Sequence, residues 1–89
     1  AAEASAAGSP AARPALSGAE RRAVEKEIAS TERRLDKLSA GVDDIHRRMA
    51  AQDQSDYEGL RRLTERLREL EGETARLEER WLELSELVG

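Results

Sequence analysis

Arginine doublets recur along this 89-residue chain, and two of them lie on either side of a short polar segment near its middle. A guanidinium is a planar fork of donors that binds phosphate without reading a base, so clustered arginines are candidates for contact with a nucleic-acid backbone. Residues 45–68 contain six arginines against four acidic residues, whereas residues 69–89 contain two against seven. The sequence therefore predicts a basic end and an acidic end, and the candidate phosphate-binding residues are Arg47, Arg48, Arg61, Arg62, Arg66 and Arg68.

These arginines also fit a second interpretation, in which they belong to the solvated face of a charged coiled coil. The formal net charge of −4 argues against a strong general nucleic-acid binder. A local excess of arginine still allows a weak, non-specific contact with DNA or ribosomal RNA through phosphates.

The sequence contains no set of residues with the spacing of a catalytic or metal site. His46 is the only histidine and cysteine is absent. Asp43 and His46 could share a helical face, but two ligands do not make a metal site. No GxxxxGK[ST] phosphate loop occurs. We therefore expect no catalytic residue, no cofactor and no metal here, and we expect His46 to pack near Tyr57 across the pair of helices.

Two runs of apolar residues with alternating spacings of three and four give the chain its predicted fold. Such spacing keeps the side chains on one stripe of a helix, and each stripe needs a partner. A chain with 38% charged residues and no Phe suits one seam between two helices better than a layered core. The prediction is an all-α fold, an antiparallel two-helix coiled-coil hairpin, built on Val24, Ile28, Thr31, Leu35, Leu38, Val42, Ile45 and Met49 in one stripe and Leu60, Leu63, Leu67, Leu70, Thr74, Leu77, Trp81, Leu84 and Val88 in the other.

Capping signals set the predicted boundaries. Ser17 followed by Glu20, and Ser55 followed by Glu58, each have the spacing of a capping box, in which the hydroxyl and the carboxylate bind backbone donors at a helix start. The segment before Ser17 is rich in Ala, Ser and Pro without periodicity, which is typical of a disordered tail. The predicted elements are a flexible linker or tail at 1–16 and a hairpin at 17–89, with helices at about 18–51 and 56–88 and a loop at about 52–55.

Side-chain charges favour one register of the hairpin. One register places Arg34 beside Glu73, whereas a shift by one heptad places it beside Arg80. The favoured register also predicts an ion pair between Glu27 and Arg80. It further predicts one layer where the hydroxyls of Thr31 and Thr74 pair, and packing of Trp81 on Val24 at the open end. We expect a monomer; because a lone helix pair is marginally stable, an intermolecular coiled coil is the alternative.

Both ends of the predicted hairpin resemble a known family. The stretch LEERWLELSELVG (Leu77–Gly89), with its run Trp81-Leu82-Glu83-Leu84, resembles the end of the C-terminal domain of ABC-F ATPases of the Uup type. The stretch PALSGAERRAVEKEI (Pro14–Ile28) is similar to that family's approach to its first helix, although Ala15 and Gly18 replace its usual Lys and Tyr.

The resemblance implies a cytoplasmic protein with two ATPase domains that acts on ribosomes, and whose C-terminal hairpin contacts nucleic acid or the ribosome. The ATPase domains would lie upstream of Ala1, and residues 1–16 would be the tether to them. We expect no contact with a membrane, because no stretch approaches the 18–20 apolar residues of a membrane span.

Two other classes of function remain open from the sequence. A purely structural spacer needs only the apolar seam. A protein-binding adaptor could bind a partner on Leu82, Leu87 and Val88, which add apolar surface beyond the seam.

Overall fold

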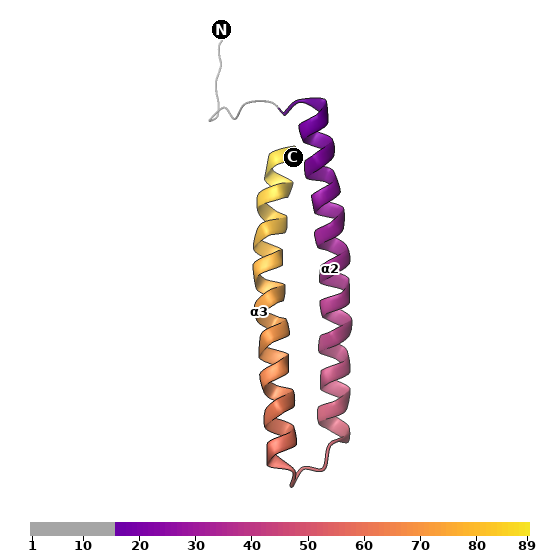
Figure 1. The fold of residues 1–89 in the computed structure, drawn as a ribbon, viewed down its shortest axis with the longest axis vertical. Helices are drawn as coiled ribbons and strands as arrows, with labels where there is room; N and C mark the ends of the chain where they lie inside the picture. The colour runs from indigo at the N-terminus through magenta and orange to yellow at the C-terminus, as the bar shows by residue number, and fades with distance from the viewer. Residues whose placement is uncertain (1–15) are drawn as a thin grey trace.

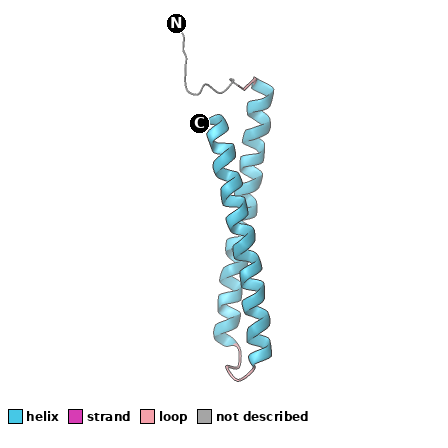
Figure 2. Ribbon diagram, turned by 90° about the vertical axis from the view of Figure 1, so that its left-hand side faces the viewer, coloured by secondary structure: helices cyan, strands magenta, loops and turns pink. Residues whose placement is uncertain are grey.

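The protein is an antiparallel pair of long helices. The structure, a computed structural model, describes residues 16–89, and within that range it contains α2 (Gly18–Ala51) and α3 (Tyr57–Val88) and no strand. The helices run side by side over their length (Figure 1) and cross in the view turned by 90° (Figure 2), as expected of a supercoiled pair. The all-α hairpin is thus confirmed. The linker predicted at residues 1–16 lies, except for Leu16, outside the described residues.

The start of α2 is fixed by the predicted capping box. The backbone N–H of Glu20 donates to Oγ of Ser17 at 3.0 Å, and the backbone N–H of Ser17 donates to Oε1 of Glu20 at 2.8 Å. The bond from the backbone N–H of Ser17, followed by the interaction with the Ser17 hydroxyl, lowers the pKa of Glu20 below its ordinary value of 4.5, because both stabilise the carboxylate form. At the other end, the extended backbone of Gln52 ends the helix after Ala51, and its N–H still donates to the carbonyl of Arg48.

The second predicted capping box does not form. Asp56, rather than Ser55, is the N-cap of α3, so the helix begins at Tyr57, one residue later than predicted. The N–H and hydroxyl of Ser55 instead donate to Oδ1 of Asp53 at 2.9 and 2.8 Å. These bonds lower the pKa of Asp53. Ser55 is thereby held in a turn inside the loop, where it cannot cap a helix.

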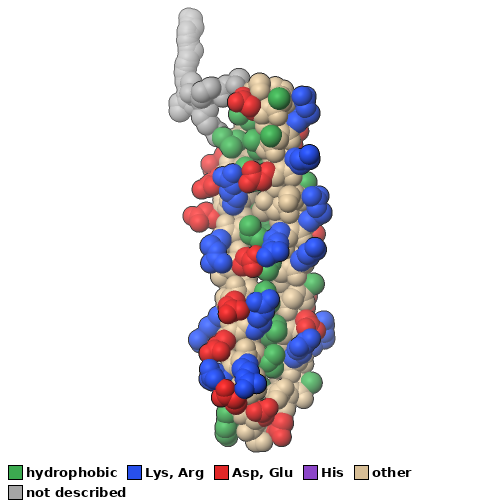
Figure 3. Space-filling view, in the orientation of Figure 1, with side chains coloured by type: hydrophobic (Ala, Val, Ile, Leu, Met, Phe, Trp, Pro, Cys, Tyr) green, Lys and Arg blue, Asp and Glu red, His purple; other side chains and the backbone are tan. Residues whose placement is uncertain are grey.

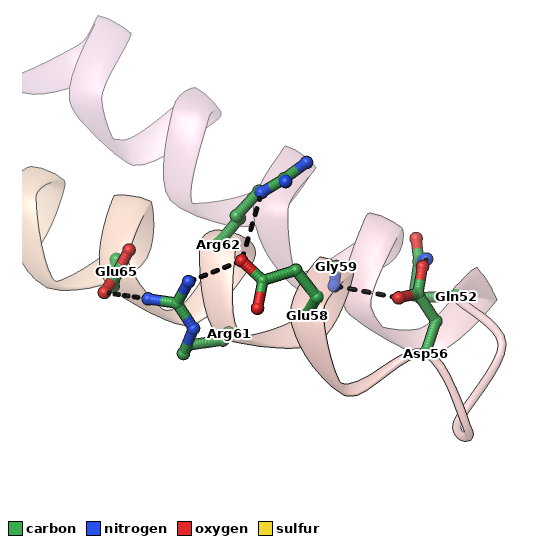
Figure 4. A network of polar contacts seen from close by, with 7 residues as sticks. All are labelled: Gln52, Asp56, Glu58, Gly59, Arg61, Arg62 and Glu65. Carbon is green, nitrogen blue, oxygen red and sulfur yellow. Dashed lines mark hydrogen bonds and ion pairs between the residues drawn. The ribbon is translucent and has the colours of Figure 1, made fainter.

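A small network around Asp56 closes the loop (Figure 4). One carboxylate oxygen accepts from the N–H of Gly59 at 3.0 Å, and the other accepts from Nε2 of Gln52 at 2.6 Å, so the end of α2 is tied to the start of α3. A Cβ on Gly59 would lie only 2.5 Å from that second oxygen and 2.8 Å from the amide nitrogen. A side chain at position 59 would therefore displace the Asp56 carboxylate and the Gln52 amide from this network.

The core is a single seam between the helices. Its buried centre is formed by Leu38, Ile45 and Leu70, and Leu84 is buried separately near the open end, with 1% of its surface exposed. Thr31 is the buried polar residue of the seam. The remaining apolar residues packed against the centre are partly buried: Val42, Met49, Leu63, Leu67 and Leu77.

The ion pairs that define the predicted register are both present. Nε of Arg34 lies 2.9 Å from Oε2 of Glu73, and Nε of Arg80 lies 3.1 Å from Oε2 of Glu27. The pair with Glu27 is the first cause of a raised pKa for Arg80. These two pairs exclude the register shifted by one heptad, which would bring Arg34 to Arg80.

The packing inside the seam differs from the predicted layers. The hydroxyls of Thr31 and Thr74 do not pair; each donates to the carbonyl four residues earlier in its own helix, at 2.8 Å. A Cβ on Gly41 would lie 3.3 Å from Cδ1 of Leu70, so Leu70 reaches into the space beside Gly41. A core side chain in a coiled coil inserts between several partner residues, and single opposed pairs describe this poorly.

At the open end, Trp81 makes a polar contact that the sequence did not predict. Trp81 is only partly buried, and its indole N–H donates to Oε2 of Glu32 at 3.0 Å. Leu84 is the fully buried residue at this end. Across the same end, Nη1 of Arg21 donates to the carbonyl of Val88 at 3.1 Å.

Candidate nucleic-acid interface

The six candidate arginines come from both helices, in the half of the hairpin that ends in the loop. Arg47 and Arg48 occupy the last turns of α2, and the other four lie in the first half of α3. All six are exposed. The exposed fractions of their side chains reach 72% for Arg47 and 74% for Arg62. The hairpin thus brings the two arginines of α2 close to four arginines that extend over about two helical turns of α3.

Carboxylates one turn away pair with the arginines at the start of α3. Glu58 accepts from Nη2 of Arg61 and lies 3.7 Å from Nε of Arg62, while Nη1 of Arg61 lies 2.8 Å from Oε2 of Glu65 (Figure 4). The bond to Glu58, followed by the charge of Glu65, raises the pKa of Arg61. These guanidiniums are therefore locally neutralised although they are exposed.

Most of the other candidate arginines are also paired with carboxylates on their own helix. Asp44 lies 2.9 Å from Nε of Arg48 and 3.7 Å from Nη2 of Arg47, and Glu69 lies 3.0 Å from Nη1 of Arg66. Both carboxylates lie just outside the sequence window that contains the arginine excess. The positive charge near the loop is consequently smaller than that window indicates. Among residues 16–89, Arg68 makes no ion pair within 4.0 Å.

Arg48 of α2 and Arg66 of α3 both line one of the grooves between the helices. The groove is also lined by Arg34 and Lys37, which the sequence prediction did not include. Their spacing along α2 could have indicated this, because residues three, four and seven positions apart share a helical face. Two acidic residues reduce the positive charge of the groove, whose charged lining is Arg34, Lys37, Arg48 and Arg66 against Asp44 and Glu73.

Charges of both signs are interspersed over the surface. Figure 3 shows Lys and Arg side chains lying beside carboxylates along both helices. The loop itself carries Asp53 and Asp56, and Glu58 follows in the first turn of α3. The arginines therefore lie on the sides of the hairpin, behind an acidic loop.

His46 and Tyr57, which the sequence predicts to lie near each other, are both exposed in the structure. His46 is exposed, and 79% of the surface of Tyr57 is exposed at the first residue of α3.

Within residues 16–89 no three His, Cys, Asp or Glu side chains are placed to hold a metal ion. In the same range no helix is both long and apolar enough to cross a membrane.

Comparison with known proteins assigns the domain. A family model described as the ABC transporter C-terminal domain matches residues 16–86, which include both helices and the loop almost entirely. No curated protein and no solved structure matches the chain. Because the matched region covers most of the chain, this protein belongs to the family of ABC transporter C-terminal domains and is an auxiliary helical domain of an ABC-type ATP-binding protein.

Proposed function

We propose that this hairpin is the nucleic-acid-contacting C-terminal domain of a cytoplasmic ABC-F type ATPase. In this proposal the hairpin is a monomer and is auxiliary to upstream ATPase domains. It contacts DNA, or ribosomal RNA in the ribosome, through phosphates. The residues that bind are Arg47, Arg48, Arg61, Arg62, Arg66 and Arg68.

The observation that carries the proposal is the accessibility of these arginines. Each ion pair they make is with a carboxylate on the same helix, three or four residues away, and both partners are exposed. Exposed pairs of this kind contribute about 0.3–0.5 kcal/mol, so a phosphate can replace the carboxylate at little cost. None of the pairs joins the two helices, and phosphate binding would therefore leave the hairpin closed.

The paired carboxylates set the expected strength. They remain beside the arginines and repel a phosphate backbone, so we expect an affinity no better than that of non-specific binders, about 10⁻⁴ to 10⁻⁶ M at physiological salt. Binding should be nearly indifferent to base sequence, because contacts through phosphates carry no direct sequence information.

The test is a titration of the 89-residue chain with short single-stranded and duplex DNA and RNA at two salt concentrations, followed by residue-resolved NMR shifts. Shifts should gather between Ile45 and Arg68 and weaken steeply with salt. Each neutralised phosphate contributes about 0.7–0.9 to the slope of log affinity against log salt. The variant that neutralises Arg47, Arg48, Arg61 and Arg62 as glutamine should therefore flatten that slope by about 3.

A matched variant controls for net charge. Neutralising four cations outside the proposed interface removes the same charge and should change the affinity and its salt slope much less. An equal loss of affinity in both variants, or no binding even at low salt, would contradict the proposal. The arginine doublets would then be solvated charges on a structural hairpin. The control substitutions are Arg22→Gln, Lys26→Gln, Arg33→Gln and Arg76→Gln.

A further inference from the structure

The two grooves between α2 and α3 have different charges. The groove described above contains four cations and two acidic residues, and both interhelical ion pairs involve arginines on that side of the seam. The opposite groove contains three carboxylates and no Lys or Arg. We call it the acidic groove, and it is lined by Leu35, Asp36, Ser39, Val42, Glu71, Thr74, Ala75 and Glu78.

The floor of the acidic groove is apolar. Leu35 and Val42 belong to the seam but are only partly buried, so part of each side chain faces the groove. The hydroxyl of Thr74 is already bonded to the carbonyl of Leu70 and requires no further partner. Ala75 completes the lining from α3. Apolar surface of this kind gains free energy when a further apolar side chain covers it.

Three carboxylates lie on the two sides of the acidic groove. Asp36 lies on the α2 side, and Glu71 and Glu78 lie on the α3 side; all three are exposed. Within residues 16–89 none of the three makes an ion pair or a side-chain hydrogen bond. By contrast, the carboxylates near the loop, such as Glu58 and Asp44, each hold two arginines.

The apolar surface continues past the groove toward the open end. Leu82 is a large hydrophobic residue with 56% of its surface exposed. It lies four residues after Glu78 and seven after Ala75, and residues at these spacings share one face of a helix. The face of α3 that borders the acidic groove therefore carries a further apolar contact point that the hairpin itself does not cover.

We propose that the acidic groove binds a basic amphipathic helix of a partner protein, which packs as a third helix against α2 and α3. Apolar residues of the partner at i, i+3 or i+4, and i+7 would cover Leu35 and Val42, and the same stripe about three turns further along would reach Leu82. Lysines or arginines on both flanks of that stripe would pair with Asp36 on one side and with Glu71 and Glu78 on the other. This inference does not depend on nucleic-acid binding, which the negative charge of this groove opposes.

The spacing of the carboxylates specifies the partner further. Glu71 and Glu78 are seven residues apart, or about 10.5 Å along the helix axis. Cations seven residues apart in a partner helix aligned with α3 have the same spacing. A basic segment lacking the apolar stripe would have only exposed ion pairs, which contribute little. The groove therefore favours a helix that carries both an apolar stripe and cations seven residues apart beside it.

The test uses a synthetic helical peptide of about three heptads as the probe, with Leu and Ala in the apolar stripe and Lys at both flanks. A matched peptide carries Glu in place of Lys. The 89-residue chain, labelled for NMR, should show shifts at Leu35, Ser39, Val42 and Ala75 with the basic peptide and none with the acidic one. The variant Asp36→Asn, Glu71→Gln, Glu78→Gln should bind the basic peptide at least tenfold more weakly, while its circular dichroism stays unchanged.

A second variant removes the same charge from the outer side of α3, through Glu65→Gln, Glu79→Gln and Glu86→Gln, and should bind the peptide within about twofold of the parent chain. Leu82→Ala should weaken binding severalfold. Equal binding by the two triple variants would overturn the proposal, as would shifts confined to the opposite groove. Shifts at the acidic groove with a DNA duplex as the probe would also overturn it, because they would mean that the carboxylates do not select a cationic partner.

Discussion

Two leucines near the end of α3, two residues apart, provide a sharp test of the seam. Leu84 has 1% of its surface exposed and Leu82 has 56%. Replacing either by alanine removes the same atoms and leaves helix propensity nearly unchanged. Any difference between the two variants in the free energy of unfolding therefore reports tertiary packing.

The expected magnitudes follow from the burial. Full burial of a leucine side chain contributes about 1.5–3 kcal/mol, and the cavity left behind raises the cost of Leu→Ala to about 2–5 kcal/mol. Leu84→Ala should therefore lower the free energy of unfolding by about 3 kcal/mol. Leu82→Ala should stay within about 0.5 kcal/mol, as is usual for an exposed site. For a domain of this size 1 kcal/mol corresponds to about 4–8 °C, so Tm should fall by about 12–24 °C for Leu84→Ala.

The assay is thermal and urea unfolding followed by circular dichroism, with both variants at the same protein concentration as the parent. A domain of this length is expected to have only on the order of 4–10 kcal/mol of stability, so the loss at Leu84 should be large on that scale. Comparable shifts in Tm for the two variants would refute the seam described here. A larger shift for Leu82→Ala would mean that α3 is rotated about its axis relative to this structure.

Three further predictions concern single residues. Gly72→Ala should raise the free energy of unfolding by about 1 kcal/mol in urea, because its Cβ would meet only Nη1 of Arg76, at 3.7 Å. Gly41→Ala should raise it clearly less, because its Cβ would lie 3.3 Å from the buried Leu70. Thr31→Val should be neutral or stabilising by up to about 1 kcal/mol in the same assay, since its hydroxyl bonds only within its own helix; a clear loss would mean that the hydroxyl has a partner across the seam. The capping carboxylate of Glu20 has a lowered pKa, so it should stabilise the fold fully above its ordinary pKa of 4.5. This contribution should disappear as the pH falls through the lower pKa of the folded state. Glu20→Gln should remove that part of the pH dependence of the free energy of unfolding measured in urea.

Much of the fold can be predicted from the sequence because it depends on local spacing. The three-four repeat of apolar residues determines which face of each helix is buried, and the short polar segment at Gln52 determines where the chain reverses. The capping box at Ser17 involves residues three apart, so its geometry is fixed within one turn. The ion pairs of Arg34 with Glu73 and of Arg80 with Glu27 were also predictable, because only one register avoids like charges there.

The loop shows where local signals become ambiguous. Ser55 and Asp56 are adjacent and both are good N-cap residues, so sequence alone cannot choose between them. The choice follows from the closure of the loop, in which Asp56 binds both Gly59 and Gln52 while Ser55 turns toward Asp53. Contacts between the ends of two helices decide this, and they exist only once the hairpin has formed.

Burial within the seam and the distribution of charge were decided by the tertiary structure. The repeat pattern treats Trp81 and Leu84 alike, yet only Leu84 is fully enclosed, because the depth of a side chain depends on how the partner helix is staggered and rotated against it. Counting charges along the chain predicted a basic end, but the structure separates charge between the two sides of the seam. One groove holds both signs, and the other holds Asp36, Glu71 and Glu78 without a cation. The sequence specifies which residues share a helical face. Packing alone sets how each helix is rotated about its own axis, and this rotation decides which faces of the two helices form a common groove.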